Sequence, residues 1–250
     1  MTDLARTLAD HGAVTSRKYE FTGETRQFLG RTLRRIRARS NFGAVSAGDV
    51  GGWIESEGNL AQTGDAWVYG AAQVYGAARV SGDAQVYGDA QVYGDARVYG
   101  DAWVYGDARV YGDAQVYGDA RVYGDARVYG DAWVYGAAQV YGAARVYGDA
   151  QVYGDAQVYG DARVYGDAHL LCIGPIGSRH AILTVTRDKG LGLRFTTGCF
   201  SGSGAEFAAA VAETHEEGST ARIEYDAAIA MIHAWAQAHE HPAQIATEAA

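Results

Sequence analysis

Cysteine, proline and methionine are scarce in this chain of 250 residues, in which each occurs only twice. The two cysteines, Cys172 and Cys199, are too few for a disulfide framework, and they lack the paired spacing of a structural zinc site. No apolar run approaches the roughly 18–20 residues that cross a bilayer, and the first residues do not resemble a secretory signal peptide. We therefore expect a cytoplasmic protein with no membrane span, no metal site and no cofactor.

Basic charge and histidine are also unevenly distributed. The formal net charge is -9, and only residues 1–50 carry more basic than acidic side chains, nine against five. None of the seven histidines lies between residues 12 and 168. General acid–base chemistry often uses histidine, so the middle of the chain has few means of performing it.

Glycine and tyrosine, by contrast, are abundant, with 34 and 18 residues respectively. From Gly64 the chain repeats the hexad G-D-A-x-V-Y, and valine recurs at every sixth position from Val68 to Val164. Two looser units, 52–54 and 58–60, precede this run, and two extra residues between Ala61 and Asp65 interrupt the register. A bias of this kind argues against a helical bundle and calls for a repeat architecture.

The hexad suits a short strand followed by a bend. A helix would distribute the valines around its axis and would place a costly glycine in every second turn. In a strand, alanine and valine point to one side, while the variable residue and tyrosine point to the other. Glycine tolerates a left-handed corner, and the aspartate carboxylate can bond nearby backbone N–H groups. Three bends would close a triangular coil of 18 residues, which predicts a parallel β-solenoid of six to seven coils over residues 52–170.

Residues 18 apart are expected to stack on three outward walls. One wall presents tyrosines beside an arginine ladder, and tryptophans are scattered over the others. We predict that these aromatic and arginine residues carry interactions: Tyr111, Tyr129, Tyr147, Tyr165, Arg109, Arg127, Arg145, Arg163, Trp67, Trp103 and Trp133. Tyrosine and arginine are enriched in protein interfaces, although tyrosine also stacks well on itself within a sheet.

The hexads resemble those of the transferase-hexapeptide superfamily, and this resemblance alone implies a left-handed solenoid. The segments 18–25, 30–38 and 47–54, together with 173–179, 198–202 and 206–207, resemble the two ends of prophage-associated hexapeptide-repeat proteins. That second resemblance implies a prophage setting and a polymer-forming or cytoskeletal label, with no established activity. Where those relatives carry Cys-Gly-Cys-Phe, this chain has Thr197-Gly198-Cys199-Phe200, so no cysteine pair is available there.

Both ends of a solenoid need a cap. We expect a flexible leader at 1–16, a β cap at 17–51 with two strands, an α+β cap at 171–240, and a frayed tail at 241–250. In the second cap, strands at 181–186 and 193–197 flank a turn, and Ser203 opens a helix with a capping box. A second helix, from about Thr220 to His239, is predicted to carry an apolar stripe of Ile223, Ala227, Ala230 or Met231, and Ala234.

Three residues are weak catalytic candidates. His169, at the last repeat unit, is the only histidine on the prism, and enzymes that resemble this prism transfer an acyl group from coenzyme A with a histidine base. Cys199, near the start of a predicted helix, and His215, about one helix further on, have the residue types of a nucleophile pair, but a structural cysteine is commoner. The three histidines at 233, 239 and 241 do not have the spacing of a strong metal site.

The main hypothesis is therefore a non-enzymatic structural or protein-interaction solenoid. It would self-associate, as a trimer or rod for example, or dock a protein partner through the Tyr-rich walls and the C-terminal cap. One alternative is a hexapeptide-repeat acyltransferase that uses an acyl-coenzyme A donor. A further alternative is an anionic polymer or nucleic acid bound by the arginine ladder, which the fourteen repeat aspartates oppose.

Overall fold

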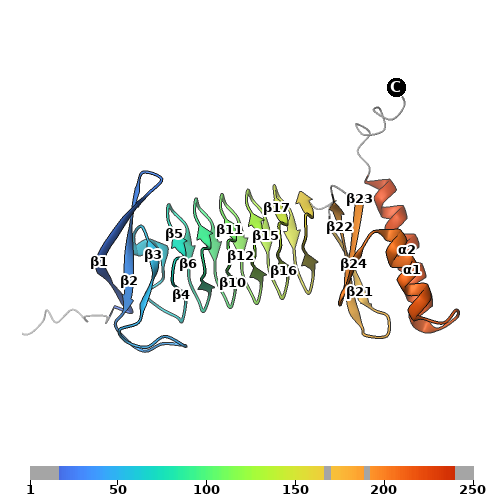
Figure 1. Cartoon of the computed structure of the whole chain (residues 1–250), viewed down its shortest axis with the longest axis horizontal. Coiled ribbons are helices and arrows are strands. Elements are labelled where there is room, and N and C mark those ends of the chain that lie inside the picture. The colour runs from blue at the N-terminus through green and yellow to red at the C-terminus, as the bar shows by residue number, and fades with distance from the viewer. Residues whose placement is uncertain (1–16, 166–169, 189–191, 240–250) are drawn as a thin grey trace, which may run out of the picture.

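The chain forms an elongated rod (Figure 1). The structure is a computed structural model that describes residues 17–165, 170–188 and 192–239. A β-hairpin lies at one end, the solenoid in the middle, and a small sheet with two helices at the other end (Figure 1). The predicted leader at 1–16 and tail at 241–250 lie outside the described residues.

The middle of the rod is a parallel β-solenoid of about six turns, which confirms the predicted fold class. Each turn contributes one short strand to each of three parallel walls. The first wall contains β5 (Gln73–Val74), β8 (Gln91–Val92), β11 (Arg109–Val110), β14 (Arg127–Val128), β17 (Arg145–Tyr147) and β20 (Arg163–Tyr165). The second contains β4 (Trp67–Val68), β7 (Gln85–Val86), β10 (Trp103–Val104), β13 (Arg121–Val122), β16 (Gln139–Val140) and β19 (Gln157–Val158). The third contains β6 (Arg79–Val80), β9 (Arg97–Val98), β12 (Gln115–Val116), β15 (Trp133–Val134) and β18 (Gln151–Val152).

The register follows the hexads. Each residue pairs with the residue 18 positions further on, as in Arg109 with Arg127 and Val110 with Val128. Before the interruption at 61–65 the offset is 20, because Ile54 pairs with Val74 and Leu60 bridges Val80. The repeat valines, and the alanine two positions before each of them, are completely buried and fill the prism. The core is therefore a stack of small side chains, as the alternation of the strand requires.

Glycine forms the corners. The hexad glycines from Gly64 to Gly160 all have φ between +57° and +73°, a region that side chains rarely adopt. At three corners the aspartate that follows donates its backbone N–H to a glycine carbonyl of the next coil, as when Asp89 N–H donates to the Gly106 carbonyl at 2.9 Å. Among the described repeat aspartates, only Asp83 accepts a backbone N–H through its carboxylate. The predicted role of the aspartate side chain in the bend was therefore wrong for most corners.

The N-terminal end is closed by an antiparallel sheet that merges with the first wall. The two predicted strands, β1 (Tyr19–Phe28) and β2 (Arg31–Ala38), pair with each other as an antiparallel hairpin. Strand β3 (Val50–Ile54) pairs antiparallel with β2 and parallel with β5. Strand β3 therefore joins the antiparallel pairing of the cap to the parallel pairing of the solenoid. A short 3₁₀ helix, η1 (Glu57–Asn59), completes the irregular first turn.

Side chains of this first region satisfy carbonyls that have no preceding coil to bond. The Lys18 Nζ donates to the Gly64 and Ala66 carbonyls at 3.1 and 2.7 Å. At the next-but-one corner the Asn59 amide donates in the same way to Gly76 and Ala78, at 3.0 and 2.9 Å. Burial lowers the pKa of Lys18 to about 8, although Asp65 and Asp83 favour its charged form.

The C-terminal end is closed by a four-stranded antiparallel sheet. Its strands are β21 (Leu170–Ile176), β22 (Ala181–Asp188), β23 (Gly192–Thr197) and β24 (Phe200–Gly202), of which β22 and β23 form the predicted hairpin. Along β22, the residues alternate between the two faces: Leu183 and Val185 join the core beneath the helices. Thr184 is buried on the other side, where its Oγ1 accepts the Gln157 N–H of the last complete coil at 3.2 Å.

Two helices cover the outer face of this sheet (Figure 1). Helix α1 (Gly204–Thr214) begins with the predicted capping box, in which Ser203 accepts from Glu206 N–H and the Glu206 carboxylate accepts from Ser203 N–H. Helix α2 (Thr220–Ala238) lies beside it. Neither described helix is long and apolar enough to cross a membrane.

The predicted apolar stripe of α2 is present, but it is not the face that packs against the sheet. The helix packs through Tyr225, Ala228 and Ile232, a set that is spaced three and four residues apart. Ile223 and Met231 instead lie on the exposed face of the helix, together with the alanines at 227, 230 and 234. Both sets satisfy helical periodicity, so α2 is apolar on two faces and only contact with the sheet decides which one is buried.

Candidate functional site

The arginine ladder of the first wall forms as predicted. Arg109, Arg127, Arg145 and Arg163 occupy successive paired positions on four neighbouring strands. Arg127 and Arg145 are half-buried, whereas the other two are exposed. None of the four makes an ion pair within 4.0 Å with any described residue. Four guanidinium groups therefore lie in a column without a carboxylate in contact.

The tyrosines form three continuous columns, one for each wall. In the first wall the rings of Tyr111 and Tyr129 are parallel, with centroids 4.9 Å apart, and Tyr129 stacks on Tyr147 at 5.0 Å. The last ring, Tyr165, is tilted by 41° against Tyr147 and is exposed. Most of the other repeat tyrosines are half-buried because each ring covers the next. The Tyr-rich walls therefore expose less aromatic surface than their composition suggests.

Side chains of the variable position support these columns. Tyr99 donates a hydrogen bond to the Gln115 side chain of the next coil at 3.2 Å, and Tyr123 and Tyr135 repeat this contact with their glutamines. Trp103 and Trp133 each contact a tyrosine edge to face. Much of the outward surface is thus occupied in holding one coil to the next.

The three predicted tryptophans have different environments. Trp103 and Trp133 are 37% and 40% exposed, in keeping with an outward position. Trp67 is only 1% exposed and contacts Tyr19 and Phe42 edge to face. Its predicted role on an interaction surface was therefore wrong, because the N-terminal sheet folds over this first repeat unit.

The basic N-terminal segment is largely neutralised within the cap. Arg31 pairs with Glu55 at 2.9 Å, Arg35 with Glu24 at 3.0 Å, and Arg39 with Glu20 at 3.7 Å. The Arg26 guanidinium lies over the Trp53 ring, 4.5 Å from its centroid. Several arginines of the N-terminal cap are therefore engaged with carboxylates or a ring of the cap itself.

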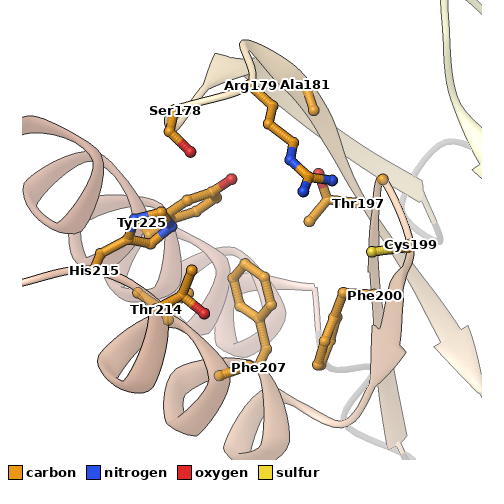
Figure 2. A pocket seen from close by; sticks show the side chains of 13 residues that line it. Ser178, Arg179, Ala181, Thr197, Cys199, Phe200, Phe207, Thr214, His215 and Tyr225 are labelled. Atoms are coloured by element: carbon orange, nitrogen blue, oxygen red, sulfur yellow. The ribbon is translucent and has the colours of Figure 1, made fainter.

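A pocket of about 240 Å³ lies in the C-terminal cap (Figure 2). It opens between the β21–β22 turn, the β23–β24 turn, α1 and α2. Its lining combines aromatic and aliphatic side chains with polar ones. The lining consists of Ser178, Arg179, Ala181, Thr197, Gly198, Cys199, Phe200, Phe207, Ala210, Val211, Thr214, His215 and Tyr225.

Aromatic contacts hold this pocket in shape. The centroid of the Phe207 ring lies 5.2 Å from that of Phe200 and 5.6 Å from that of Tyr225. His215 stacks on Tyr225 with the ring centroids 5.5 Å apart. Burial, with help from the negative charge of Glu224, raises the pKa of Tyr225 above its ordinary value. Gly177 packs so closely on the Tyr225 hydroxyl that an added Cβ would lie 2.2 Å from it. The turn that positions Ser178 and Arg179 is therefore packed tightly against α2.

The structure places two of the weak catalytic candidates, Cys199 and His215, at this same pocket. They lie on opposite sides of it (Figure 2), with no hydrogen bond between them. Cys199 is exposed at the β23–β24 turn, and His215 is the C-cap of α1. Because a catalytic pair needs hydrogen-bond contact, this arrangement is that of two pocket residues rather than a nucleophile and its base.

The remaining catalytic candidate, His169, lies outside the described residues. The described residues of the solenoid contain no other histidine. No group of three or more His, Cys, Asp or Glu side chains in the described part of the chain is arranged to hold a metal ion. Sequence reasoning missed the pocket itself, because its lining comes from four separated segments and no single motif marks them.

In a comparison with known protein families, the repeat region matches one family model. Seven segments match the model described as YdcK Beta solenoid repeat, at residues 72–88, 90–106, 102–118, 114–125, 120–136, 138–155 and 156–170. A stretch of 61 residues is 43% identical to the "Uncharacterized acetyltransferase YdcK" of Escherichia coli (strain K12). That match covers 21% of this chain and 19% of the relative, so it spans about a fifth of either protein.

Proposed function

We propose that the protein is a non-enzymatic structural solenoid, a rigid rod that self-associates through its C-terminal cap. The repeated wall supports this role, since coil after coil presents the same tyrosine and glutamine or arginine positions. The described coils follow one another without an inserted loop between residues 66 and 165. The continuous columns of stacked rings stiffen the rod by joining each coil to the next.

The observation that carries the proposal is the outer face of α2. Ile223 is 59% and Met231 48% exposed, and the alanines at 227, 230 and 234 lie between and beside them. Alanine allows a second helix to approach closely, and larger apolar residues on either side supply area to bury. Because α2 lies at one end of the rod (Figure 1), pairing of two such faces would join two rods end to end. Such a contact is self-complementary, as twofold dimers require.

Sedimentation analysis tests the contact. We expect the wild-type protein to behave as a dimer of twice its 26.6 kDa, and the double variant Ile223→Glu, Met231→Glu to behave as a monomer, because two carboxylates would have to be buried in the contact. The control is Leu29→Glu at the tip of the β1–β2 hairpin, where the leucine is 77% exposed at the other end of the rod; it should leave the dimer intact.

A wild-type monomer at every concentration, with no filaments or joined rods in electron micrographs, would show that self-association is wrong. If the wild-type dimer persists in the double variant, the contact lies elsewhere. The exposed tryptophans at 103 and 133 would then be the next positions to test.

Acyl transfer is the second candidate function, and the name of the similar Escherichia coli protein is the observation that favours it. Under the structural proposal, acetyl-coenzyme A should leave the melting temperature of the protein unchanged. A clear rise in melting temperature that His169→Ala abolishes would favour the enzyme instead. The change His180→Ala, in the turn before β22, is a matched control that removes a histidine from outside the repeat.

A further inference from the structure

The pocket of the C-terminal cap contains two polar groups that have no partner among the described residues. The Oγ1 atom of Thr197 is buried, yet it has no hydrogen-bond partner among the described residues. The Arg179 guanidinium extends toward Thr197 (Figure 2), and no described carboxylate lies within 4.0 Å of it. A buried hydroxyl without a partner costs free energy, and an arginine fork matches a carboxylate in geometry and charge. Arg179 and Thr197 therefore offer hydrogen-bond donors for an anion at one end of the pocket.

The acidic residue that precedes Tyr225 does not fill this role. Glu224 is engaged with the backbone, where its carboxylate accepts the Gly177 N–H at 2.6 Å. This bond anchors the turn that carries Arg179 to α2. Arg179 is therefore kept at the pocket, and the Glu224 carboxylate is already bonded to the Gly177 N–H.

The other end of the pocket is apolar. The rings of Phe200 and Phe207 face the space (Figure 2), and Ala210 and Val211 of α1 complete the wall. The volume of about 240 Å³ is slightly below the range of about 300–1,000 Å³ for pockets that hold drug-sized ligands. The space thus suits a small molecule with one apolar group.

We propose that this pocket binds a small carboxylic acid with an aromatic or branched apolar tail. The carboxylate accepts hydrogen bonds from the Arg179 guanidinium and the Thr197 hydroxyl, and the tail packs against Phe200 and Phe207. Because the proposal rests on the pocket alone, it is independent of whether the rod self-associates through α2.

Ligand-observed NMR and calorimetry with the full chain test this site, with benzoate and phenylacetate as probes and benzyl alcohol and 2-phenylethanol as their neutral counterparts. We expect the acids to bind with dissociation constants on the order of 0.1–1 mM, and the alcohols about tenfold or more weakly. The change Arg179→Gln should reduce the affinity for the acids to that for the alcohols. Arg179 is exposed, so this substitution leaves the folded cap intact.

Two further variants separate the site from general effects. Arg187→Gln removes an arginine of β22 whose side chain donates to the His239 carbonyl and which does not line the pocket; binding should be unchanged. Ala210→Phe should fill the pocket from α1 and abolish binding of acids and alcohols alike. Bound acid should also slow alkylation of Cys199, which lines the pocket, relative to Cys172.

Equal affinity for acids and alcohols, or unchanged binding by Arg179→Gln, would overturn the proposal. So would the absence of binding by either acid at 10 mM, about ten times the weakest dissociation constant expected. Binding of phenyl phosphate in preference to the carboxylates would equally count against it, since the proposal commits to a carboxylate.

Discussion

Replacing the corner glycine Gly112 with alanine is expected to destabilise the solenoid by about 2–4 kcal/mol, more than most single substitutions in the rod. Two effects combine at this position. Its φ of +71° is one that a residue with a Cβ adopts only at a cost of about 1–2 kcal/mol. In addition, an alanine Cβ would lie 2.9 Å from the backbone nitrogen of Gly130 in the next coil. Because that neighbour is backbone, it cannot move aside without separating the coils.

Gly154 provides the matched control for this prediction. It has nearly the same backbone conformation, with φ of +61°, but an added Cβ would meet no atom within 4 Å. Gly154→Ala should therefore incur only the conformational cost of about 1 kcal/mol. Urea unfolding followed by circular dichroism measures both variants. Equal losses in Gly112→Ala and Gly154→Ala would mean that the close approach of successive corners contributes nothing.

The solenoid itself could be predicted because every local preference of the hexad favours the same arrangement. Val110 has to face inward once the strand is assigned, and Gly112 has to turn the chain. The period of 18 then follows from three equal corners, and it predicts the observed pairing of Arg109 with Arg127. Agreement between local and global preferences makes such a repeat easy to interpret.

The ends could be predicted only in part, because contacts between distant segments decide them. Trp67 has the sequence context of an outward repeat residue, yet it is buried because the segment around Tyr19 and Phe42 folds over it. Helix α2 has two apolar faces, and its own sequence does not reveal that Ile232 rather than Met231 meets the sheet. The pocket is similar, since Arg179 and Thr197 come together only through the packing of two turns.

The aspartates show a subtler limit. Their regular position after the corner glycine indicates a turn, and the turn is present. Where the described repeat aspartates make hydrogen bonds, however, they mostly use the backbone: Asp83, Asp89 and Asp95 each donate their N–H to a glycine carbonyl of the next coil at 2.9 Å. The carboxylates are therefore largely left to the solvent, and they account for much of the net charge of -9. A position explained by local turn chemistry thus also contributes to the acidity of the rod surface, which favours solubility.

Alkaline pH is expected to unfold the rod cooperatively, because the folded columns resist ionisation of their tyrosines. Burial raises the pKa of many repeat tyrosines, to about 12 for Tyr75 and Tyr141. A charged neighbour in the column adds to the effect, as Tyr105 does for Tyr123. In the unfolded chain the same phenols titrate near pH 10.

The sign of the effect follows from proton binding. Above about pH 10 the folded state retains protons that the unfolded state has lost, so the free energy of unfolding decreases as pH rises. Lys18 has the opposite effect on stability, and it does so over a lower range of pH. Its pKa is lowered to about 8 from 10.5, so the unfolded state binds more protons between these values and stability rises with pH there. One lysine is opposed by many phenols, so stability should pass through a shallow maximum and then fall steeply.

Absorbance at 295 nm, which reports phenolate, and far-ultraviolet circular dichroism should therefore change together between about pH 10 and 12. The titration should be steeper than that of independent tyrosines. Tyr111→Phe combined with Tyr129→Phe removes two ionisable groups from the middle of one column, where the stacked spacing is 4.9 Å, and should move the midpoint to higher pH. Tyr153→Phe, at the end of another column and 49% exposed, should have a smaller effect. Phenolate absorbance that rises fully while the circular dichroism stays native would show that the columns tolerate charge, and that stacking of neutral rings does not hold the coils together.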